Sequence, residues 1–564
     1  MITLGVCDNH DSGACILKDG ELVFAVNEER LSRQKLQGGF PRMAVEECLR
    51  RTGTRPSEID TVVFASRMTP TAALRLLSFW HDVLRRKSSS FSYLLNIYII
   101  YQVIAHFFKF PESAEGFLSE KILASAMARF GIRAPVHCIG HHEAHAATAY
   151  YSAGSDEKTL IFTVDGMGDG LSVTVSVGQG QHIERVYEQS GFSAISTHYQ
   201  RLTEFLGFTP VRHEGKITSL AAYGKYNEAI YKAAKNIFRF SERIEGFEYK
   251  NYFLPQSPDR APYGSLRGHS REDIAFNFQK DFEDEIEKFI SWWVTKMKIS
   301  RVALAGGIFA NVSLNQRIKD SEGVRSVYIF PHMGDGGLAV GAAWAYAKPK
   351  PFYLKSVYLG PPYENASIKS LLDREKIDYA FLSEEALCEK VAELLAQGKT
   401  VGHFNGRMEF GPRALGNRSV LYRGDDTTIM KWLNEKMDRS PFMPFAPVSL
   451  DSECESLYQG IDAVRYALRF MTVAVDCTDK MKRVCPGGVH VDGTARPQLL
   501  LREDNPRLYR ILEFYREKKG IGTILNTSFN RHEEPIVCSP EDALRSFQEC
   551  GLDVLVLNNF LIAR

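Results

Sequence analysis

Three features are missing from this chain of 564 residues, and each absence narrows the class of protein. The ten cysteines include no Cys-x-x-Cys pair, which argues against a disulfide framework or a structural zinc site. Lysine and arginine together number 69 against 68 acidic residues, so the chain lacks the basic excess with which proteins bind nucleic acid. The N-terminus lacks the charged-then-apolar pattern of a signal peptide, so we expect a cytoplasmic protein.

A long uninterrupted apolar run is missing as well. The most apolar segment, residues 91–110 (FSYLLNIYIIYQVIAHFFKF), is interrupted by Asn96, Gln102, His106 and Lys109. We therefore expect no membrane span and predict a buried helix within an insertion. An apolar wall for an amphiphilic acceptor is the alternative interpretation of this segment.

The composition is typical of a folded globular protein, with 44% hydrophobic and 11% aromatic residues, and the length favours two domains. A proline-containing break at residues 348–351 (KPKP) marks the boundary between them. We predict a first domain over residues 1–347, a linker over 348–360 and a second α/β domain over 361–564.

Short β-branched runs predict strands, and longer stretches with helical periodicity predict helices, in an α/β order. In the first domain we expect strands over residues 2–6, 13–17, 22–26, 62–65, 136–139, 160–164, 302–305 and 327–330, and helices over 42–53, 114–131, 142–150, 311–320 and 338–347. In the second domain we expect helices over 384–397 and 506–518 and strands over 400–404 and 521–525. The hairpin-rich start suits a ribonuclease-H-like sheet. Two halves, one near Asp8 and Asp165 and one near Gly306 and Asp335, are expected to face each other across a nucleotide cleft.

Two histidines four residues apart are the most informative side chains. His141 and His145 fall on one face of the expected helix, where two imidazoles can bind one divalent metal ion, whereas His142 points elsewhere and suits a structural role. The strand over 160–164 runs into a glycine-rich acidic turn, residues 163–170 (TVDGMGDG), where backbone amides can approach phosphate. This combination favours chemistry on a nucleotide, and surface histidines beside an ordinary turn are the alternative.

Arginines in glycine-containing loops distinguish the second domain. Planar guanidinium groups can hold phosphate or carbamate oxygens through paired hydrogen bonds, and the alternative for each arginine is a surface salt bridge. Ser528, at a strand end between Asn526 and Asn530, can offer an anion its hydroxyl and backbone donors. The candidate arginines are Arg407, Arg413, Arg418 and Arg496.

Blocks of sequence that span nearly the whole chain resemble the bacterial O-carbamoyltransferases of natural-product and nodulation-factor biosynthesis, in the order of that family. In the first domain the blocks are residues 8–14 (DNHDSGA), 27–33 (NEERLSR), 141–146 (HHEAHA), 164–166 (VDG), 214–216 (EGK), 220–224 (LAAYG), 306–312 (GGIFANV) and 335–343 (DGGLAVGAA). In the second they are residues 406–416 (GRMEFGPRALG), 444–447 (PFAP), 490–496 (HVDGTAR) and 526–530 (NTSFN).

The resemblance implies an N-terminal domain of the actin/hexokinase (ASKHA) superfamily, similar to the tRNA threonylcarbamoyltransferases. It implies a C-terminal domain similar to the threonylcarbamoyl-adenylate synthases (YrdC-like), which makes carbamoyl adenylate from carbamoyl phosphate and ATP. The N-terminal domain then passes the carbamoyl group to a hydroxyl of a small-molecule acceptor, a natural product or a sugar. Such an enzyme requires neither nucleic acid nor a membrane span, and a homodimer is compatible with it.

The resemblance also carries site residues over to this chain. His141, His145 and Asp335 are implied as metal ligands; the family's ion is iron(II), and the ligand set also suits zinc, manganese or cobalt. The implied nucleotide contacts are Lys216, Gly306, Gly307, Asn311 and Arg413. The carbamoyl phosphate contacts are Arg407, Arg496, Ser528 and Lys436.

Three side chains are candidates for the transfer step itself. His10, with Asp8 nearby, can deprotonate the acceptor hydroxyl or steady the leaving adenylate, and a turn histidine that caps its own loop is the alternative. Asp165 can orient the acceptor or a metal-bound water.

Three departures from the family pattern concern local contacts. In residues 436–446 (KMDRSPFMPFA) the family lysine falls at Met437 and the arginine before Pro444 is Met443, so Lys436 is the substitute lysine by a shift of one residue. Residues 532–535 (HEEP) replace Lys-Gly-Glu-Pro beside the expected anion site. Residues 35–36 (KL) replace a Lys-His pair.

Three rival functions use only part of these features. An ATP-dependent kinase of the actin/hexokinase superfamily accounts for the glycine-rich acidic turns but leaves the histidines and the arginines unused. A metallohydrolase uses the histidines and leaves the second domain idle. A non-catalytic ATP-gated module hydrolyses ATP without any dependence on carbamoyl phosphate.

Overall fold

The computed structural model describes residues 1–76, 100–108, 110–249, 263–437 and 444–564, and it divides into two compact units. The first unit comprises Met1–Glu28 and Leu36–Leu354, and the second comprises Glu29–Lys35 and Lys355–Arg564. The change of unit after Leu354 falls within the segment for which we predict a linker. The assignment of residues 29–35 to the second unit has no counterpart in the sequence predictions.

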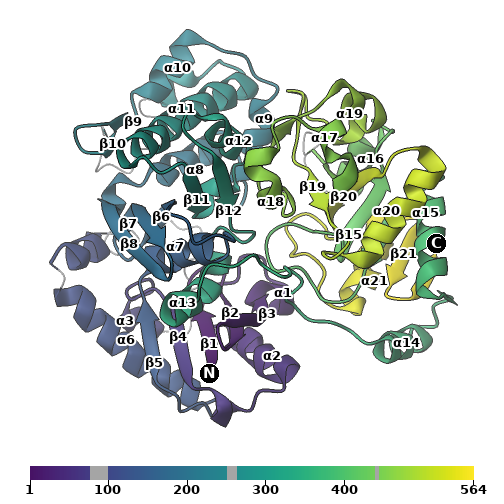
Figure 1. Cartoon of the computed structure of the whole chain (residues 1–564), viewed down its shortest axis with the longest axis horizontal. Helices are drawn as coiled ribbons and strands as arrows, with labels where there is room; N and C mark the ends of the chain where they lie inside the picture. The colour runs from purple at the N-terminus through teal and green to yellow at the C-terminus, as the bar shows by residue number, and fades with distance from the viewer. Residues whose placement is uncertain (77–99, 109, 250–262, 438–443) are drawn as a thin grey trace. The chain divides into compact units, whose positions relative to one another are not determined.

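The first unit contains two five-stranded sheets with the same internal order (Figure 1). One sheet has the order β3-β2-β1-β4-β5 and the other the order β8-β7-β6-β11-β12. In each sheet three strands form an antiparallel meander, and two further strands continue parallel to the first strand of the meander. This repeat confirms the predicted α/β fold of the actin/hexokinase type. The strands are β1 (Ile2–Cys7), β2 (Gly13–Lys18), β3 (Glu21–Asn27), β4 (Thr61–Ala65), β5 (Val136–Ile139), β6 (Thr159–Gly168), β7 (Leu171–Gln179), β8 (His182–Ser190), β11 (Arg301–Ala305) and β12 (Ser326–Ile329).

Two buried helices connect these sheets, α7 (His141–Tyr151) and α13 (Leu338–Ala347). Helix α13 packs on β1 and β4 of the first sheet, helix α7 packs on β6 and β11 of the second, and the two helices pack against each other. They come close because Gly341 has no side chain: a Cβ there would lie 2.1 Å from the carbonyl oxygen of Ala144. The contact brings the start of α7 near the start of α13.

The other helices of the first unit cover the outer parts of the sheets. Helix α2 packs on β2 and β3, α6 packs on β5, and the long α11 contacts α9, α10 and α12. Their bounds are α2 (Arg42–Thr52), α3 (Ala72–Arg75), α6 (Phe110–Ala128), α8 (Ile195–Phe205), α9 (Glu214–Ala221), α10 (Glu228–Lys235), α11 (Arg271–Met297) and α12 (Val312–Asp320), with a ribbon of β9 (Phe238–Ser241) and β10 (Gly246–Tyr249).

Two predictions about the first domain are wrong. Asp165 does not belong with Asp8: it lies on β6, in the same sheet as β11, which precedes Gly306, whereas Asp8 follows β1 in the other sheet. The expected turn at 163–170 is also shorter, because β6 continues to Gly168 through an irregular pairing with β7. Only Asp169 and Gly170 form the turn, both with a positive φ.

The apolar segment 91–110 is described only in part, because residues 91–99 and 109 lie outside the described residues. Residues 100–108 are helical, as predicted, but this stretch is not a buried helix. Gln102 and Ala105 are buried, whereas Ile104, Phe107 and Phe108 are exposed. Within the described residues, every helix is too short or too polar to cross a bilayer.

The second unit is built on an eight-stranded mixed sheet with the order β13-β22-β21-β14-β15-β20-β16-β19. Helices α15 and α20 pack together and contact β14, β15, β20 and β16, and α21 packs on β14 and β21. The strands are β13 (Ala380–Phe381), β14 (Val401–Phe404), β15 (Arg418–Arg423), β16 (Ala446–Leu450), β19 (Gln498–Leu500), β20 (Thr523–Ser528), β21 (Val554–Leu557) and β22 (Phe560–Ala563), with a small pair of β17 (Val475–Asp476) and β18 (Thr494–Ala495).

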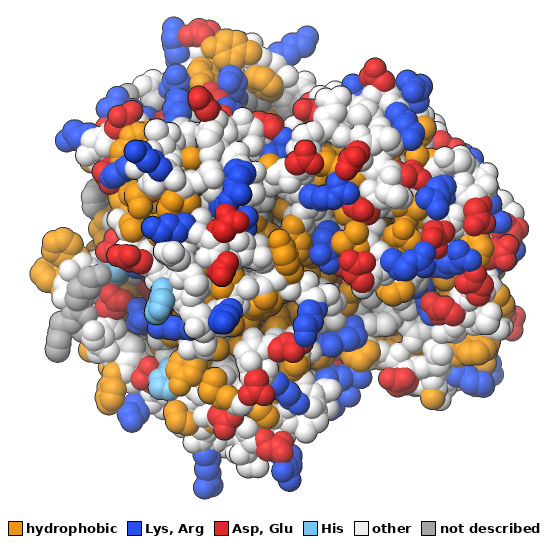
Figure 2. Space-filling view, in the orientation of Figure 1, with side chains coloured by type: hydrophobic (Ala, Val, Ile, Leu, Met, Phe, Trp, Pro, Cys, Tyr) orange, Lys and Arg blue, Asp and Glu red, His pale blue; other side chains and the backbone are white. Residues whose placement is uncertain are grey.

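The helices of the second unit follow the predictions at 384–397 and 506–518 within a few residues. They are α14 (Asn365–Arg374), α15 (Glu384–Ala396), α16 (Ile429–Lys436), α17 (Cys454–Leu457), α18 (Arg465–Leu468), α19 (Asp479–Val484), α20 (Pro506–Lys519) and α21 (Pro540–Cys550), and α1 (Glu28–Ser32) starts at the end of β3. Basic and acidic side chains are intermixed over the face that Figure 2 presents, in agreement with the near-zero net charge.

Candidate functional site

The imidazoles of His141 and His145 lie side by side at the start of α7, as the spacing predicts, with ring centres 4.8 Å apart. Both side chains are almost fully buried. The ring of His141 packs on Gly168 of β6, where a Cβ would lie 2.0 Å from the ring. Residue 168 must therefore lack a side chain for His141 to take this position.

Two carboxylates complete the cluster. Asp165 comes from β6, and Asp335 comes from the short 3-10 helix (Asp335–Gly337) that leads into α13. His145 Nε2 lies 2.9 Å from Asp165 Oδ2 and 3.5 Å from Asp335 Oδ1, and His141 Nε2 lies 3.6 Å from each of the same oxygens. One ligand atom from each of the four residues falls within 4.8 Å of all the others. The structure thus brings the three predicted ligands together and adds Asp165.

This cluster fits a divalent metal ion. The Nε2 atom of His141 is buried and has no hydrogen-bond partner, which is the arrangement expected of an atom with a lone pair reserved for a metal. Two imidazole nitrogens and two carboxylate oxygens are a donor set used by iron, zinc, manganese and cobalt.

A proton on His145 balances the carboxylates in the metal-free protein. Desolvation favours the neutral ring, but its hydrogen bonds to Asp165 and Asp335 outweigh desolvation and raise the pKa of His145 to about 9. Burial opposes ionisation of Asp165, yet the adjacent imidazoles of His141 and His145 hold its pKa well below the usual range. A metal ion that enters this site takes the place of that proton as the local positive charge.

The turn that carries Asp335 is held by Asn27, the last residue of β3. The side-chain amide of Asn27 donates to the carbonyl oxygen of Gly336 at 3.1 Å, and its oxygen lies 3.0 Å from Nε2 of His332. These contacts tie the start of α13 to the β2–β3 hairpin, so the position of Asp335 is fixed by both sheets. Asn27 begins the block 27–33 that resembles the family, but only its contacts in the structure indicate what it does.

The predicted catalytic residues Asp8 and His10 have different surroundings. Asp8 is buried in a bidentate ion pair with Arg75, at 2.9 and 3.1 Å, which occupies both carboxylate oxygens and favours a positioning role. His10 is exposed. Desolvation lowers the pKa of His10, but the charges of Asp335, Asp11 and Asp165 outweigh this effect and raise it. The imidazole of His10 thus lies within the electrostatic reach of the metal cluster.

His142 has the structural role that its position on the helix suggests. Its Nδ1 lies 2.6 Å from the hydroxyl of Thr163, and its Nε2 lies 3.1 Å from the carbonyl oxygen of Leu171. Because the carbonyl only accepts, Nε2 carries the proton and Nδ1 accepts from Thr163. Burial and the neighbouring histidines lower the pKa of His142 well below its usual range, so the ring is neutral.

The predicted nucleotide contacts in the first unit lie at the ends of β11 and α9. Gly306 has a φ of +107°, and a Cβ there would lie 2.1 Å from the carbonyl oxygen of Val164, so the chain turns tightly after β11. The side chain of Asn311 caps α12 by accepting from the amides of Ser313 and Leu314. Lys216 on α9 is largely buried. Asn311 is thus committed to the backbone of its own helix.

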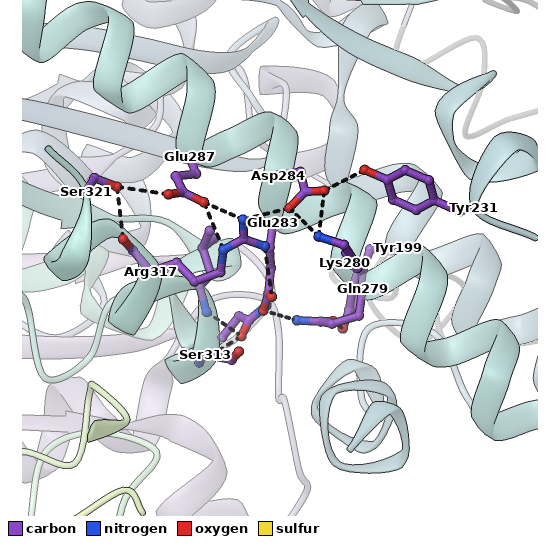
Figure 3. A network of polar contacts seen from close by, with 12 residues as sticks. Tyr199, Tyr231, Gln279, Lys280, Glu283, Asp284, Glu287, Ser313, Arg317 and Ser321 are labelled. Atoms are coloured by element: carbon purple, nitrogen blue, oxygen red, sulfur yellow. Dashed lines mark hydrogen bonds and ion pairs between the residues drawn. The ribbon is translucent and has the colours of Figure 1, made fainter. Parts of the chain in front are cut away.

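A polar network joins side chains of α11 and α12 (Figure 3). Glu283 of α11 accepts from the amide of Asn311 at 3.3 Å and also contacts Gln279 and Arg317. Arg317 of α12 is shared with Asp284 and Glu287, which joins α11 to α12. Desolvation raises the pKa of Glu283 above its usual value. The network fixes the start of α12, and sequence reasoning missed it because its members are spread over two helices.

In the second unit, two charged side chains, Arg418 and Glu409, hold the backbone of the loop over residues 405–417. The guanidinium of Arg418 donates to the carbonyl oxygens of Asn405, Asn417, Pro361 and Gly406 at 2.8–3.1 Å, and it lies 3.6 Å from the ring centre of Phe404. The carboxylate of Glu409 accepts from the amides of Leu415, Asn417 and Arg418 at 2.7–3.0 Å. Arg418 is therefore a structural residue, and sequence reasoning missed Glu409.

Arg413 and Arg496 form the candidate anion site. Desolvation lowers the pKa of Arg413 to about 10, and desolvation together with the charge of Arg413 lowers the pKa of Arg496 well below its usual range. Among the residues that the structure describes, Arg496 has no hydrogen-bond or ion-pair partner. A desolvated guanidinium that faces a second guanidinium, and that has no acidic partner among the described residues, is a site for an anion.

Two buried amides fix the loop of Arg413 to the strands beside it. Gln498 donates to the carbonyl oxygen of Leu415 at 2.9 Å, and Asn526 donates to that of Ala414 at 3.1 Å and to Gln498 at 2.9 Å. Ser528 ends β20, two residues after Asn526. The predicted contacts Arg413, Arg496 and Ser528 thus belong to segments that hydrogen bonds tie together.

The two remaining predicted contacts with carbamoyl phosphate have other surroundings. Arg407 donates to the carbonyl oxygens of Leu359 at 2.6 Å and Gly360 at 3.4 Å, and desolvation lowers its pKa. Lys436 is exposed at the end of α16, with its ammonium 5.9 Å from the ring centre of Trp432. Residues 438–443, which follow it, lie outside the described residues. A role of Lys436 in anion binding stays a prediction.

Comparisons with known proteins agree with the resemblance inferred from the sequence. A family model described as Carbamoyltransferase N-terminus matches residues 3–344, and one described as Carbamoyltransferase C-terminus matches residues 392–564. An uncharacterised protein of Methanocaldococcus jannaschii is 34% identical over 459 residues, which cover 77% of this chain and 74% of that protein. One of Synechocystis is 31% identical over 602 residues, covering 98% and 95%.

A protein with a more informative name is also similar to this chain. The nodulation protein NolNO of Sinorhizobium fredii is 28% identical over 573 residues, which cover 98% of this chain and 79% of that protein. The two family models together match well over half of the chain. The chain therefore belongs to the carbamoyltransferase family.

Proposed function

We propose that this carbamoyltransferase activates a carbamoyl group at the arginines of its second unit and transfers it to a hydroxyl at the imidazole and carboxylate cluster of its first unit. The observation that carries the proposal is the contrast in charge between the two sites. The desolvated guanidinium of Arg496, which has Arg413 beside it and no acidic partner among the described residues, suits phosphorylated substrates, whereas two imidazoles with two carboxylates suit a divalent cation.

In the second unit the proposed reaction is the formation of carbamoyl adenylate, with carbamoyl phosphate, ATP and water giving carbamoyl adenylate, phosphate and pyrophosphate. Arg413 and Arg496 hold the phosphate oxygens, and Ser528 supplies a hydroxyl at the end of β20. Binding of the anion removes the repulsion between the two guanidinium groups, so part of its binding energy comes from relief of an unfavourable state. In this mixed anhydride AMP is the leaving group, and donors placed at its phosphate stabilise the negative charge that develops as the bond to the carbamoyl carbon breaks.

In the first unit the proposed reaction is attack of the acceptor hydroxyl on the carbamoyl carbon, with AMP as the leaving group. When bound at His141, His145, Asp165 and Asp335, a divalent ion supplies Lewis-acid polarisation of an oxygen. His10 takes the proton of the hydroxyl at its imidazole, and Asp8 holds the loop of His10 through its pair with Arg75. The proposed nucleotide contacts are Lys216, Gly306 and Gly307, while Asn311 shapes the loop.

The test is a mixture of protein, labelled carbamoyl phosphate and ATP, followed for pyrophosphate. We expect pyrophosphate release that requires both substrates, and carbamoylation of an acceptor from a panel of hydroxylated natural products and sugars. A kinase would form ADP and a phosphorylated acceptor instead. An ATP-gated module would release phosphate from ATP without carbamoyl phosphate, and either result would replace the proposal.

A further inference from the structure

Ser66 is an unusual residue at the end of β4. Its φ is +71°, in the left-handed region that favours glycine, and its side chain is fully buried. Its backbone amide donates to the carbonyl oxygen of Ile139 at 2.7 Å, and its own carbonyl accepts from Arg75 at 3.0 Å. A glycine would adopt this conformation without strain. The presence of serine at this position therefore points to a role for its hydroxyl group.

The hydroxyl of Ser66 faces the imidazole of His141. Its Oγ lies 3.0 Å from Nδ1, the ring nitrogen on the far side from the metal cluster. The side-chain amide of Asn9 donates to the same Oγ at 3.0 Å and lies 3.4 Å from Nδ1. With the ring packed on Gly168, His141 is thus held at Nδ1 while Nε2 stays without a partner.

Asp169 fixes both ends of this contact. Its carboxylate accepts from the amides of Arg67 and Met68 at 2.9 and 2.7 Å, directly after Ser66, and from the amide of His141 at 2.9 Å. The backbone amide of Asp169 donates to the hydroxyl of Thr69 at 2.9 Å. One carboxylate therefore links the strained chain around Ser66 to the first turn of α7.

We propose that Ser66 is a positioning residue that sets the affinity of the metal centre by fixing the tautomer of His141. Binding of a metal through Nε2 requires the proton on Nδ1, and Ser66 Oγ is the acceptor for that proton. Asp169 places Ser66 and the backbone of His141 in register, and Asn9 orients the hydroxyl. The proposal rests on the proposed metal site.

The experiment titrates metal-free protein with Co²⁺ and follows the visible absorption of the bound ion, in parallel with thermal unfolding of the metal-free protein. In Ser66→Gly, we expect Co²⁺ affinity to fall by about 10- to 100-fold, the range typical for loss of a partner behind a metal ligand. The unfolding temperature should stay equal or rise, because glycine relieves the backbone strain. A merely structural serine would not separate these two readouts.

Two further variants keep the test decisive. Ser66→Ala retains the Cβ and is expected to weaken Co²⁺ binding as Ser66→Gly does, without the gain in stability. Ser152→Ala is the matched control, because Ser152 is a buried serine at the other end of α7 whose hydroxyl contacts Thr148 and Tyr328. It should leave Co²⁺ affinity unchanged.

The outcomes separate the two proposals. If the wild-type protein binds no Co²⁺, or no other divalent ion offered, the metal centre itself is wrong. If the wild type binds Co²⁺ and either Ser66 variant binds it with equal affinity, the metal centre stands and the positioning role of Ser66 is overturned. If both variants lose affinity and Ser152→Ala does not, the role of Ser66 is supported.

Discussion

The metal cluster of the first unit and the arginine pair of the second differ in how their charges are balanced. In the first, a proton on His145 offsets part of the negative charge of Asp165 and Asp335 before any ion binds. In the second, no acidic side chain among the described residues pairs with Arg496, and the positive charge of Arg413 further disfavours its charged form. A metal ion therefore replaces a proton in the first site, whereas in the second site the folded protein is stabilised when an anion binds.

The backbone around the two sites is held in a similar way. Asp169 in the first unit and Glu409 in the second are both buried carboxylates that accept from three backbone amides of a loop. The second unit adds Arg418, which satisfies four backbone carbonyls. Glu409 and Arg418 are thus bound to the backbone, whereas Arg496 makes no hydrogen bond or ion pair among the described residues.

The largest expected effect is on the metal cluster. Asp335→Asn keeps the shape of the side chain and removes one charge from the four-residue cluster. We expect loss of bound metal and a fall of about 10²- to 10³-fold in carbamoyl transfer to an acceptor, since a Lewis acid contributes several kcal/mol to such a step. Pyrophosphate release should persist. Metal content and both partial reactions are the measurements.

Asp19→Asn is the control for this variant, because Asp19 is an exposed carboxylate that pairs only with the N-terminal amine among its described contacts. It should keep metal and both activities. Equal loss of pyrophosphate release and transfer in Asp335→Asn would mean that the two reactions do not use separate sites.

The opposite pattern is expected for the arginine pair. Arg496→Met should reduce pyrophosphate release by about 10²-fold, since loss of a buried charge that pairs with a ligand costs about 2–5 kcal/mol. It should leave metal content unchanged. Because the variant removes a desolvated charge that faces Arg413, the anion-free protein should unfold at a higher temperature than the wild type. Phosphate should stabilise the wild type and not the variant.

Arg407→Met provides the matched comparison for Arg496→Met. Its guanidinium is bonded to the carbonyl oxygens of Leu359 and Gly360, so its loss leaves buried acceptors without a donor. We expect a lower unfolding temperature in this case. A rise in both variants would indicate that repulsion between Arg413 and Arg496 is not the cause.

A smaller effect is expected where the two helices of the first unit meet. Gly341→Ala places a methyl group against the carbonyl oxygen of Ala144 and should separate α7 from α13. We expect a loss of about 1–3 kcal/mol in the free energy of unfolding. Co²⁺ affinity should also fall, because the two histidines lie in the first turns of α7 and Asp335 directly precedes α13. Gly215→Ala, in open space on α9, should be neutral or stabilising by urea titration.

The smallest effect is expected at Lys436. Its ammonium is exposed, so Lys436→Gln should change the free energy of unfolding by less than about 0.5 kcal/mol. For the same reason we expect KM for carbamoyl phosphate to change by less than about threefold. Steady-state kinetics with ATP in excess measures it. A rise of tenfold or more would support the role that the sequence predicts for this lysine.

Local signals in the sequence predicted the parallel strands and the two buried helices of the first unit, but only a minority of the elements of the second unit. Runs such as 62–65 and 302–305 are short, apolar and bounded by turn residues, and they form buried parallel strands. The spacing of His141 and His145 predicted their shared helix face, because that relation depends on helix geometry alone. Resemblance supplied the family and Asp335, which lies 190 residues beyond His145 in sequence.

Relations between distant segments could not be predicted in this way. Ser66 lies 75 residues before His141, and nothing in the sequence around either residue indicates their contact. The expected turn at Asp165 failed for a related reason: Gly168, one of the glycines that suggested it, belongs to β6 and is needed for the packing of His141. Arg418 was a candidate for anion binding because its partners are backbone carbonyl oxygens, which the sequence does not reveal.

The placement of residues 29–35 has a consequence for the order in which the protein forms. Arg33 donates to the carbonyl oxygens of Pro535 and Ile536, about 500 positions later in the chain, and Leu31 packs on a cluster that includes Met408 and Cys538. During synthesis this short stretch leaves the ribosome long before its partners exist. A fragment that starts at residue 355 would lack it, and would expose the socket of Leu31 to water. A gene split at that position therefore encodes a second unit that lacks residues 29–35.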